Sequence, residues 1–326
     1  VAGQSGGYGD SRITVRGFQQ DNTAFLLNGQ PINGMEDGKM YWSNWSGMSD
    51  IANAIQIQRG LGSSKLAISS VGGTVNFVTK ATDKKQGGFA SMGVANNDYF
   101  KSTVGYNTGM SKKGFGFSVM LSHWQGDGYN MGTKGNFKWN DQNVTTLQIN
   151  TNQGRDVEFA ALNMDLIYDK TWMFQLKHLA EFNQKYLKHL DFNSYYSFVD
   201  HSMGTPDRKM VSDVQSTTYG ARLESKFAFG KNIFYTGLDY KHEGAENIRM
   251  IMPAMMPMRD GTSWQDSSID QIGWFNEYQM NFKNSKLVAS LRLDYNKGDA
   301  KALSNLFKTL YGDGKAENFN HSLSLG

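Results

Sequence analysis

Apolar and polar residues alternate with a period of two along most of the chain after residue 86. In the segment SKLVASLRLDY (285–295), leucine, alanine and tyrosine fall on one face, whereas Lys286, Arg292 and Asp294 fall on the other. The segments TYGARLESKFAF (218–229) and QIGWFNEYQMNF (271–282) divide in the same way. Because successive side chains of a strand point to opposite faces, this pattern predicts a series of β-strands, each with one apolar and one polar face.

The same alternation occurs in soluble β proteins and in membrane β-barrels, which differ in where the apolar face points. The polar faces carry charges such as Arg222, Glu224 and Lys226, which a packed core could hold only at a large desolvation cost. Several segments run for about ten residues, the length with which a tilted strand crosses a bilayer. Aromatic residues recur near their ends, where interfacial girdles lie. We therefore favour a transmembrane barrel over a soluble β protein.

The first 85 residues follow a different pattern. Short apolar segments broken by glycine occur at RITVRGF (12–18), AFLLNGQPI (24–32), AIQIQRGLG (54–62) and VGGTVNFVTK (71–80). We place a small mixed domain at residues 1–85 and the barrel strands at residues 86–326. Within the first domain, MEDGKMYWSNWSGM (35–48) is predicted to be a long aromatic loop, and loops on a rigid scaffold commonly carry binding groups.

The length of the second region limits the size of the barrel. About 240 residues supply about nine strands, at roughly 25 residues for a strand with its connection. A barrel of that size is filled by its own side chains, whereas 22-stranded transporters have a plugged lumen. We therefore expect the C-terminal strands to lie beyond Gly326, and the first domain to be truncated at Val1.

Composition removes several classes of function. The net charge of +3 is small and evenly spread, which argues against a nucleic-acid partner. The chain has no cysteine, so it forms neither disulfides nor thiolate metal sites. We find no nucleophile beside a base, no phosphate-binding loop and no convincing pair of carboxylates, and we expect no enzymatic activity.

Three segments of the first domain resemble, in order, the plug signatures of TonB-dependent outer-membrane transporters: DSRITVRGF (10–18), FLLNGQPI (25–32) and IQIQRGLGSSKLAISSVGGTVNFVTK (55–80). The phrase MEDGKMYWSNWSGMSD (35–50) is similar to members from the Bacteroidetes. The resemblance implies an all-β transmembrane barrel of the 22-stranded type, with a mixed α/β plug inside its lumen. It also implies a place in the outer membrane of a Gram-negative, Bacteroidetes-like bacterium.

The same resemblance implies the partners. They are the TonB-ExbB-ExbD energy-coupling complex and outer-membrane lipids, and a surface lipoprotein is a further candidate. Arg16 and Arg59 match arginines on plug strands of this family. We expect structural roles for both, because a buried charge must be paired, and the polar lumen faces offer Glu224 and Glu277 as partners.

The segment LDFNSYYSFVDHSMGTPDRKM (190–210) resembles a barrel strand of TonB-dependent copper receptors, in which a tyrosine-rich run is followed by Asp-His-x-Met. The resemblance implies that His201 and Met203 bind copper. Residue parity places both on the lumen face, about 7 Å apart at the backbone. An imidazole and a thioether suit copper, Cu(I) above all, because soft sulfur prefers a soft ion.

The plug half of the site departs from the copper subfamily, whose plug loop offers a cysteine and, four residues later, a methionine. Met40 takes the methionine position, Glu36 takes the cysteine position, and Met35 precedes it. The candidate metal ligands are therefore Met35, Met40, His201 and Met203, in a site weaker than a thiolate one. The structural alternative stays open, because a single histidine is commonly hydrogen-bonded and methionine commonly fills gaps in a core.

Five of the 17 methionines lie close together, at Met250, Met252, Met255, Met256 and Met258. We expect a strand to end near Tyr240 and the next to begin near Gln271, which leaves an extracellular loop of about 30 residues. Pro253 and Pro257 oppose a helix there. The loop is a candidate surface for soft-metal capture, or a flexible apolar patch for a ligand or a partner lipoprotein.

The sequence thus predicts TonB-dependent import of copper, as the ion or a small chelate, with copper as cargo and no required cofactor. An importer of an organic ligand, such as a siderophore, haem, vitamin or glycan, is the main alternative. The second alternative is an outer-membrane component that serves assembly or adhesion rather than transport.

Overall fold

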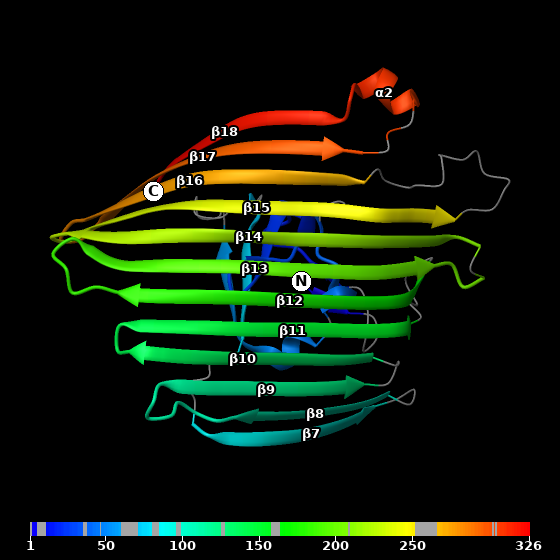
Figure 1. Ribbon diagram of the computed structural model, residues 1–326, viewed down its shortest axis with the longest axis horizontal. Coiled ribbons are helices and arrows are strands. Elements are labelled where there is room, and N and C mark those ends of the chain that lie inside the picture. Colours follow the sequence, from blue (N-terminus) through cyan, green and yellow to red (C-terminus); the bar gives the residue numbers. More distant parts are fainter. Residues whose placement is uncertain are drawn as a thin grey trace.

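The computed structural model describes residues 2–4, 11–34, 38–45, 47–59, 71–79, 85–95, 99–124, 128–157, 164–207, 209–251, 266–301, 303 and 305–326. Within them, a four-stranded sheet with short helices lies against one face of a much larger antiparallel sheet (Figure 1). Along the chain, short strands and short helices come first, and a long run of strands follows them. Among the described residues, no helix combines the length and apolarity needed to cross a membrane.

The N-terminal sheet has the order β4-β3-β6-β5, with β3 and β6 parallel. We refer to this sheet and its short helices as the plug. Its elements, together with the separate pair β1 and β2, are β1 (Ala2–Gln4), β2 (Ser11–Ile13), η1 (Gln20–Asn22), β3 (Thr23–Leu27), β4 (Gln30–Pro31), η2 (Trp42–Trp45), α1 (Met48–Ile51), β5 (Ala52–Arg59) and β6 (Gly73–Thr79).

The large sheet is an antiparallel meander in which each strand pairs with the next along the chain (Figure 1). We refer to it as the barrel wall. Its elements are β7 (Gly87–Ala95), β8 (Tyr99–Asn107), β9 (Phe115–Trp124), β10 (Gly128–Asn140), β11 (Asn143–Val157), β12 (Asp165–Glu181), β13 (Leu187–Gly204), β14 (Val211–Phe229), β15 (Asn232–Ile251), β16 (Ser267–Asn281), β17 (Lys286–Ala300) and β18 (Lys315–Leu325); α2 (Asn305–Tyr311) precedes the last strand.

Two expectations about this sheet were wrong. It has twelve strands in the described residues rather than nine, because turns at one end are as short as residues 141–142 and 230–231. The connection between β15 and β16, which holds four of the five clustered methionines, was expected to be about 30 residues long. It comprises only residues 252–266, because β15 continues to Ile251 and β16 begins at Ser267. The strands run on past the apolar segments from which their ends were predicted.

The outer face of the wall carries two bands of aromatic residues. Near the short turns, Phe227, Phe234 and Tyr278 lie in one row, with ring centroids 6.3 and 6.4 Å apart. In the second band, Tyr219 stacks on His242 at 4.6 Å. Tyr219 and Phe227 are eight residues apart on β14, about 26 Å along a strand at about 3.3 Å per residue. The spacing fits the apolar band of an outer-membrane barrel, which is about 25 Å tall.

The inner face holds paired charges, as the alternation predicts. Arg222 pairs with Glu224 at 2.7 Å, and Lys241 pairs with Glu243 at 3.0 Å. A third group on the same face is formed by Arg292, which pairs with Asp239 at 2.8 Å and with Asp294 at 2.5 Å. Pairing within the wall explains how a polar face full of charges is kept at low solvent exposure.

Plug and wall share one apolar core. Phe25 and Met40 are almost fully buried in it, and the wall contributes Met120 from β9 and Met173 from β12. These two methionines point inward from the wall, which places the plug on the concave side of the sheet. The plug is therefore fixed by apolar burial as well as by polar contacts.

The polar contact between α1 and the wall centres on Asp50. Its carboxylate accepts a hydrogen bond from Lys101 Nζ at 2.7 Å and another from Ser122 Oγ at 2.9 Å. The side chains of Lys101 and Asp50 are 26% and 15% exposed, so water screens the pair only in part. Asp50 thus links the plug to two neighbouring strands of the wall.

Replacing Asp50 with alanine is expected to destabilise plug docking by about 1 to 2 kcal/mol, since one charged acceptor is lost and Lys101 is left without it. Hydrogen exchange of the α1 and β5 amides, read by mass spectrometry on the protein in detergent, would measure the change. Asp21→Ala is the control, because Asp21 is an exposed plug carboxylate bonded to its neighbour Asn22. Equal exchange in both variants would show that the Asp50 contact does not hold the plug.

Candidate metal site between plug and barrel wall

Strand β13 places His201 and Met203 on the inner face of the wall, as residue parity predicted. His201 is 8% exposed and lies opposite Asp169 on β12 and Val214 on β14. Both residues lie beyond Tyr196, which belongs to the second aromatic band because it lies directly opposite Tyr219. The longer connections of the wall lie at this end, and in barrels of this kind longer loops are extracellular. The candidate site is therefore near the outer mouth.

The plug reaches His201 through η2 and the residue before it. His201 Nδ1 lies 3.3 Å from the side-chain oxygen of Asn44. The ring of Tyr41 meets the imidazole edge to face, with centroids 6.0 Å apart. Both plug residues belong to the aromatic stretch 35–48 that the sequence singled out as a binding loop. The structure thus brings the two segments together at one histidine.

Met203 has an apolar environment of its own. It is partly buried and packs against a cluster formed by Trp124, Val157 and Leu166. Trp124 comes from β9, and Val157 and Leu166 come from the facing ends of β11 and β12. Packing therefore fixes the Met203 side chain on the same face of β13 as His201. This packing contributes to the apolar contacts of the wall whether or not the thioether binds a metal.

The plug methionines differ from the arrangement that the resemblance implied. Met40 is 1% exposed and packs in the plug core with Phe25, Trp45 and Met48. The plug residues that contact His201 are Tyr41 and Asn44, which lie one and four positions after Met40 in the sequence. Met35 lies outside the described residues.

Asp169 is a site residue that the sequence did not reveal. It lies directly opposite His201 and is fully buried, and its carboxylate accepts hydrogen bonds from Asn152 Nδ2 at 2.6 Å and Thr171 Oγ1 at 3.3 Å. Only the pairing register of β12 and β13 shows that Asp169 adjoins the histidine. Within the described part of the chain, no three histidine, aspartate or glutamate side chains converge as a metal site.

The turn after β13 is closed by a small polar network. Thr205 Oγ1 donates to Asp207 Oδ1 at 2.7 Å, and the backbone N–H of Lys209 donates to the same oxygen at 3.2 Å. The bonds from Thr205 and Lys209 lower the pKa of Asp207 to about 2. The turn that follows His201 and Met203 therefore keeps an ionised Asp207 down to strongly acidic pH.

The cluster of five methionines is only partly described. The backbone of Met250 lies at the end of β15 opposite Ser212, which is itself opposite Met203. Met250 thus shares a row of the sheet with Met203, two strands away. Met252, Met255, Met256 and Met258 lie outside the described residues.

Of the two plug arginines, Arg16 is described with its side chain and Arg59 with its backbone alone. Arg16 is exposed in the tight turn between Val15 and Phe18, with φ of 57°. Arg59 ends β5, where its backbone lies opposite Gly73, and its side chain is outside the described part of the structure. Glu224 pairs with Arg222, and Glu277 accepts a hydrogen bond from Gln279 at 2.6 Å. Each glutamate thus has a partner within the wall.

Comparison with known proteins supports the resemblance seen in the sequence. Residues 1–74 match the family model of the TonB-dependent Receptor Plug Domain. No curated protein matches the chain. The N-terminal part is thus a TonB-dependent receptor plug.

Solved structures of outer-membrane-type transporters and receptors were compared with the chain, and those that match it cover nearly all of it at low identity. The copper transporter OprC matches with a TM-score of 0.82 and 18% identity, over 100% of this chain and 55% of that chain. The FrpB iron transporter from Neisseria meningitidis matches with a TM-score of 0.73 and 14% identity, over 97% of this chain and 55% of that chain. The siderophore receptor PiuA from Acinetobacter baumannii matches with a TM-score of 0.67 and 13% identity, over 99% of this chain and 57% of that chain.

These similarities establish the fold, a TonB-dependent receptor plug against a receptor-type barrel wall. The chain spans about 55% of the length of the first structures that it matches.

Proposed function

We propose that this chain, a receptor plug set against a receptor-type barrel wall, imports copper across the outer membrane with energy from TonB. The observation that carries the proposal is the meeting of His201 with the aromatic plug loop at Asn44 and Tyr41, beside Met203 on the same face of β13. A soft ion bound there would touch plug and wall at once. The similarity to a copper transporter supports the choice of ion.

The chemistry of the pair suits copper as cargo. With Nδ1 facing Asn44, Nε2 is the imidazole nitrogen that would bind the ion, and a hydrogen bond from the other nitrogen commonly orients a metal-binding histidine. The thioether of Met203 is a soft ligand that favours Cu(I). Asp169 supplies a buried carboxylate on the neighbouring strand, adjacent to the imidazole.

The plug ligands and the methionine cluster have supporting roles in this proposal. Met40 would need to leave the plug core to bind, so it and Met35 are secondary ligands that a shift of the plug loop would bring to His201. The cluster from Met250 to Met258 would capture the ion before it reaches the site, since Met250 lies in the row of Met203.

Metal analysis of the purified protein tests the proposal. After reconstitution with Cu(I) and removal of excess metal, the wild type is expected to retain stoichiometric copper, and the double variant His201→Ala, Met203→Leu is expected to lose it. Leucine preserves the packing against Trp124 and Leu166 while removing sulfur. His189→Ala is the matched control, because His189 has the same parity at the other end of β13.

Loss in the double variant with retention in the His189 control would support the site. Equal copper in all three proteins, or none in the wild type, would overturn it and favour import of an organic ligand. The similarity to iron and siderophore receptors makes that the second candidate. The parallel test is growth of a deletion strain under copper limitation, where growth equal to that of the parent contradicts copper import.

A further inference from the structure

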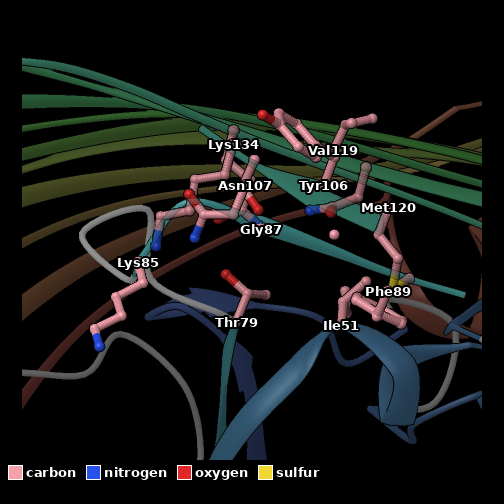
Figure 2. A pocket seen from close by; sticks show the side chains of 14 residues that line it. Ile51, Thr79, Lys85, Gly87, Phe89, Tyr106, Asn107, Val119, Met120 and Lys134 are labelled. Atoms are coloured by element: carbon pink, nitrogen blue, oxygen red, sulfur yellow. The ribbon is translucent and has the colours of Figure 1, made fainter. Parts of the chain in front are cut away.

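A second site lies deeper between plug and wall. A cavity of about 250 Å³ separates the end of α1 and β6 from strands β7 to β11 (Figure 2). Ile51 and Thr79 line it from the plug, and Phe89 and Met120 line it from the wall, with Lys85 on the approach to β7. It is distinct from the His201 site, whose residues do not line it.

Two buried side-chain amides of β11 line this cavity with unused donors. Gln148 is 2% exposed and Asn150 is 8% exposed, and neither amide nitrogen has a hydrogen-bond partner among the described residues. Both residues lie on the inner face, two positions apart on β11. A buried N–H group without an acceptor loses the hydrogen bond that it would make to water, so these donors favour a ligand that brings acceptors.

The orientation of Gln148 is fixed by a relay that starts at a backbone group. The N–H of Thr79 donates to Asn28 Oδ1 at 2.9 Å, which makes the other side-chain atom of Asn28 its nitrogen. That nitrogen donates to Gln148 Oε1 at 2.5 Å. The oxygen of Gln148 is thereby occupied, and its NH₂ group is left as the donor that the cavity can use.

The charges around the cavity have one sign. Lys134 lies directly opposite Gln148 on β10, and Lys85 adds a second ammonium group. Among the described residues that line the cavity, none is acidic. The apolar side chains of Ile51, Phe89 and Met120 complete the wall. Amide donors and ammonium groups beside an apolar surface are the complement of a small carboxylate with a short hydrocarbon body.

We propose that this cavity binds a small carboxylate, held by the amide groups of Gln148 and Asn150 and attracted by Lys134 and Lys85. A second, smaller cavity adjoins it, since Ile51 and Asn150 line both. Asn44, which contacts His201, lines the smaller one. The smaller cavity thus has lining residues in common with both sites. A role of the larger cavity as an intermediate site on the inward path rests on the proposed transport function, whereas carboxylate binding does not.

Calorimetric titration of the metal-free protein in detergent with succinate tests the proposal. Succinate is expected to bind at one site, and Gln148→Leu and Asn150→Leu are each expected to weaken binding about tenfold, which corresponds to about 1.4 kcal/mol. Lys134→Gln is expected to weaken binding and to reduce its dependence on salt. The uncharged diamide succinamide is expected to bind at least tenfold more weakly than succinate.

Gln175→Leu is the matched control. Gln175 lies opposite Gln148 on β12, is also buried, and bonds to the backbone oxygen of Asn28, but it does not line the cavity. Thermal unfolding of each variant checks its fold, and Asn150→Leu leaves the relay through Asn28 intact should Gln148→Leu unfold. Binding that is lost in the two lining variants and kept in the Gln175 control supports the site.

Absent binding in the wild type would show a merely hydrated cavity and overturn the proposal. So would equal affinity in the lining variants, or equal affinity for succinamide. The double variant His201→Ala, Met203→Leu is expected to bind succinate normally. Failure of the copper proposal therefore leaves this result unchanged, and failure of succinate binding leaves the copper result unchanged.

Discussion

Replacing Arg292 with leucine is expected to destabilise the barrel wall by about 3 to 5 kcal/mol, the cost of leaving buried charges without their partner. The guanidinium of Arg292 donates to both carboxylate oxygens of Asp239 at 2.8 Å, and to Asp294 at 2.5 and 2.9 Å. The side chains of Arg292 and Asp239 are 4% and 7% exposed. Without the arginine, two carboxylates would face each other across β15 to β17 with little water to screen them.

Unfolding in urea, followed by far-ultraviolet circular dichroism in lipid vesicles, would measure the loss. Arg292→Lys is expected to recover only part of it, because an ammonium group cannot form the bidentate contact with Asp239. Lys209→Ala is the control, since its pair with Asp207 is exposed on both sides and is worth at most about 1 kcal/mol. A stability of Arg292→Leu within the range of the Lys209 control would refute the structural role of the cluster.

The same cluster shows which part of the fold the sequence could predict. Alternation placed Arg292 and Asp294 on the polar face, and the structure agrees. Their partner Asp239 lies two strands away, and only the register of β15, β16 and β17 brings the three together. Gly273 lies between them, and an added Cβ there would collide with the guanidinium. The need for glycine at this position comes from a side chain on the neighbouring strand, so the pattern of apolar and polar residues in β16 does not indicate it.

The ends of the strands were harder to predict than their faces. The apolar period stops where a strand leaves the bilayer, whereas backbone pairing continues, so β15 was expected to end near Tyr240 and continues to Ile251. At the candidate site, parity located His201 and Met203 correctly on one face. Asp169 and Asn44 became visible only through strand pairing and plug docking, because contacts across about 30 to 157 positions carry no local pattern.

Asn28→Ala is expected to destabilise the plug by about 2 to 5 kcal/mol, for two separable reasons. Asn28 and Gly29 form the two-residue turn between β3 and β4, with φ of 51° and 88°, and alanine pays about 1 to 2 kcal/mol in that left-handed region. The substitution also removes the side-chain bonds to Thr79 and Gln148, leaving a buried amide without any partner, at about 1 to 3 kcal/mol.

Asn28→Gly separates the two contributions, because glycine adopts the turn without strain but lacks the amide. It is expected to lie between the wild type and Asn28→Ala in the opening free energy of the plug, measured by hydrogen exchange of the β3 and β6 amides. Both variants are expected to weaken succinate binding, since Gln148 loses the bond that fixes its orientation. If both variants exchange like the wild type and bind succinate equally well, Asn28 does not link the hairpin turn to the wall. If glycine is as costly as alanine, the amide relay rather than the backbone conformation accounts for the whole effect.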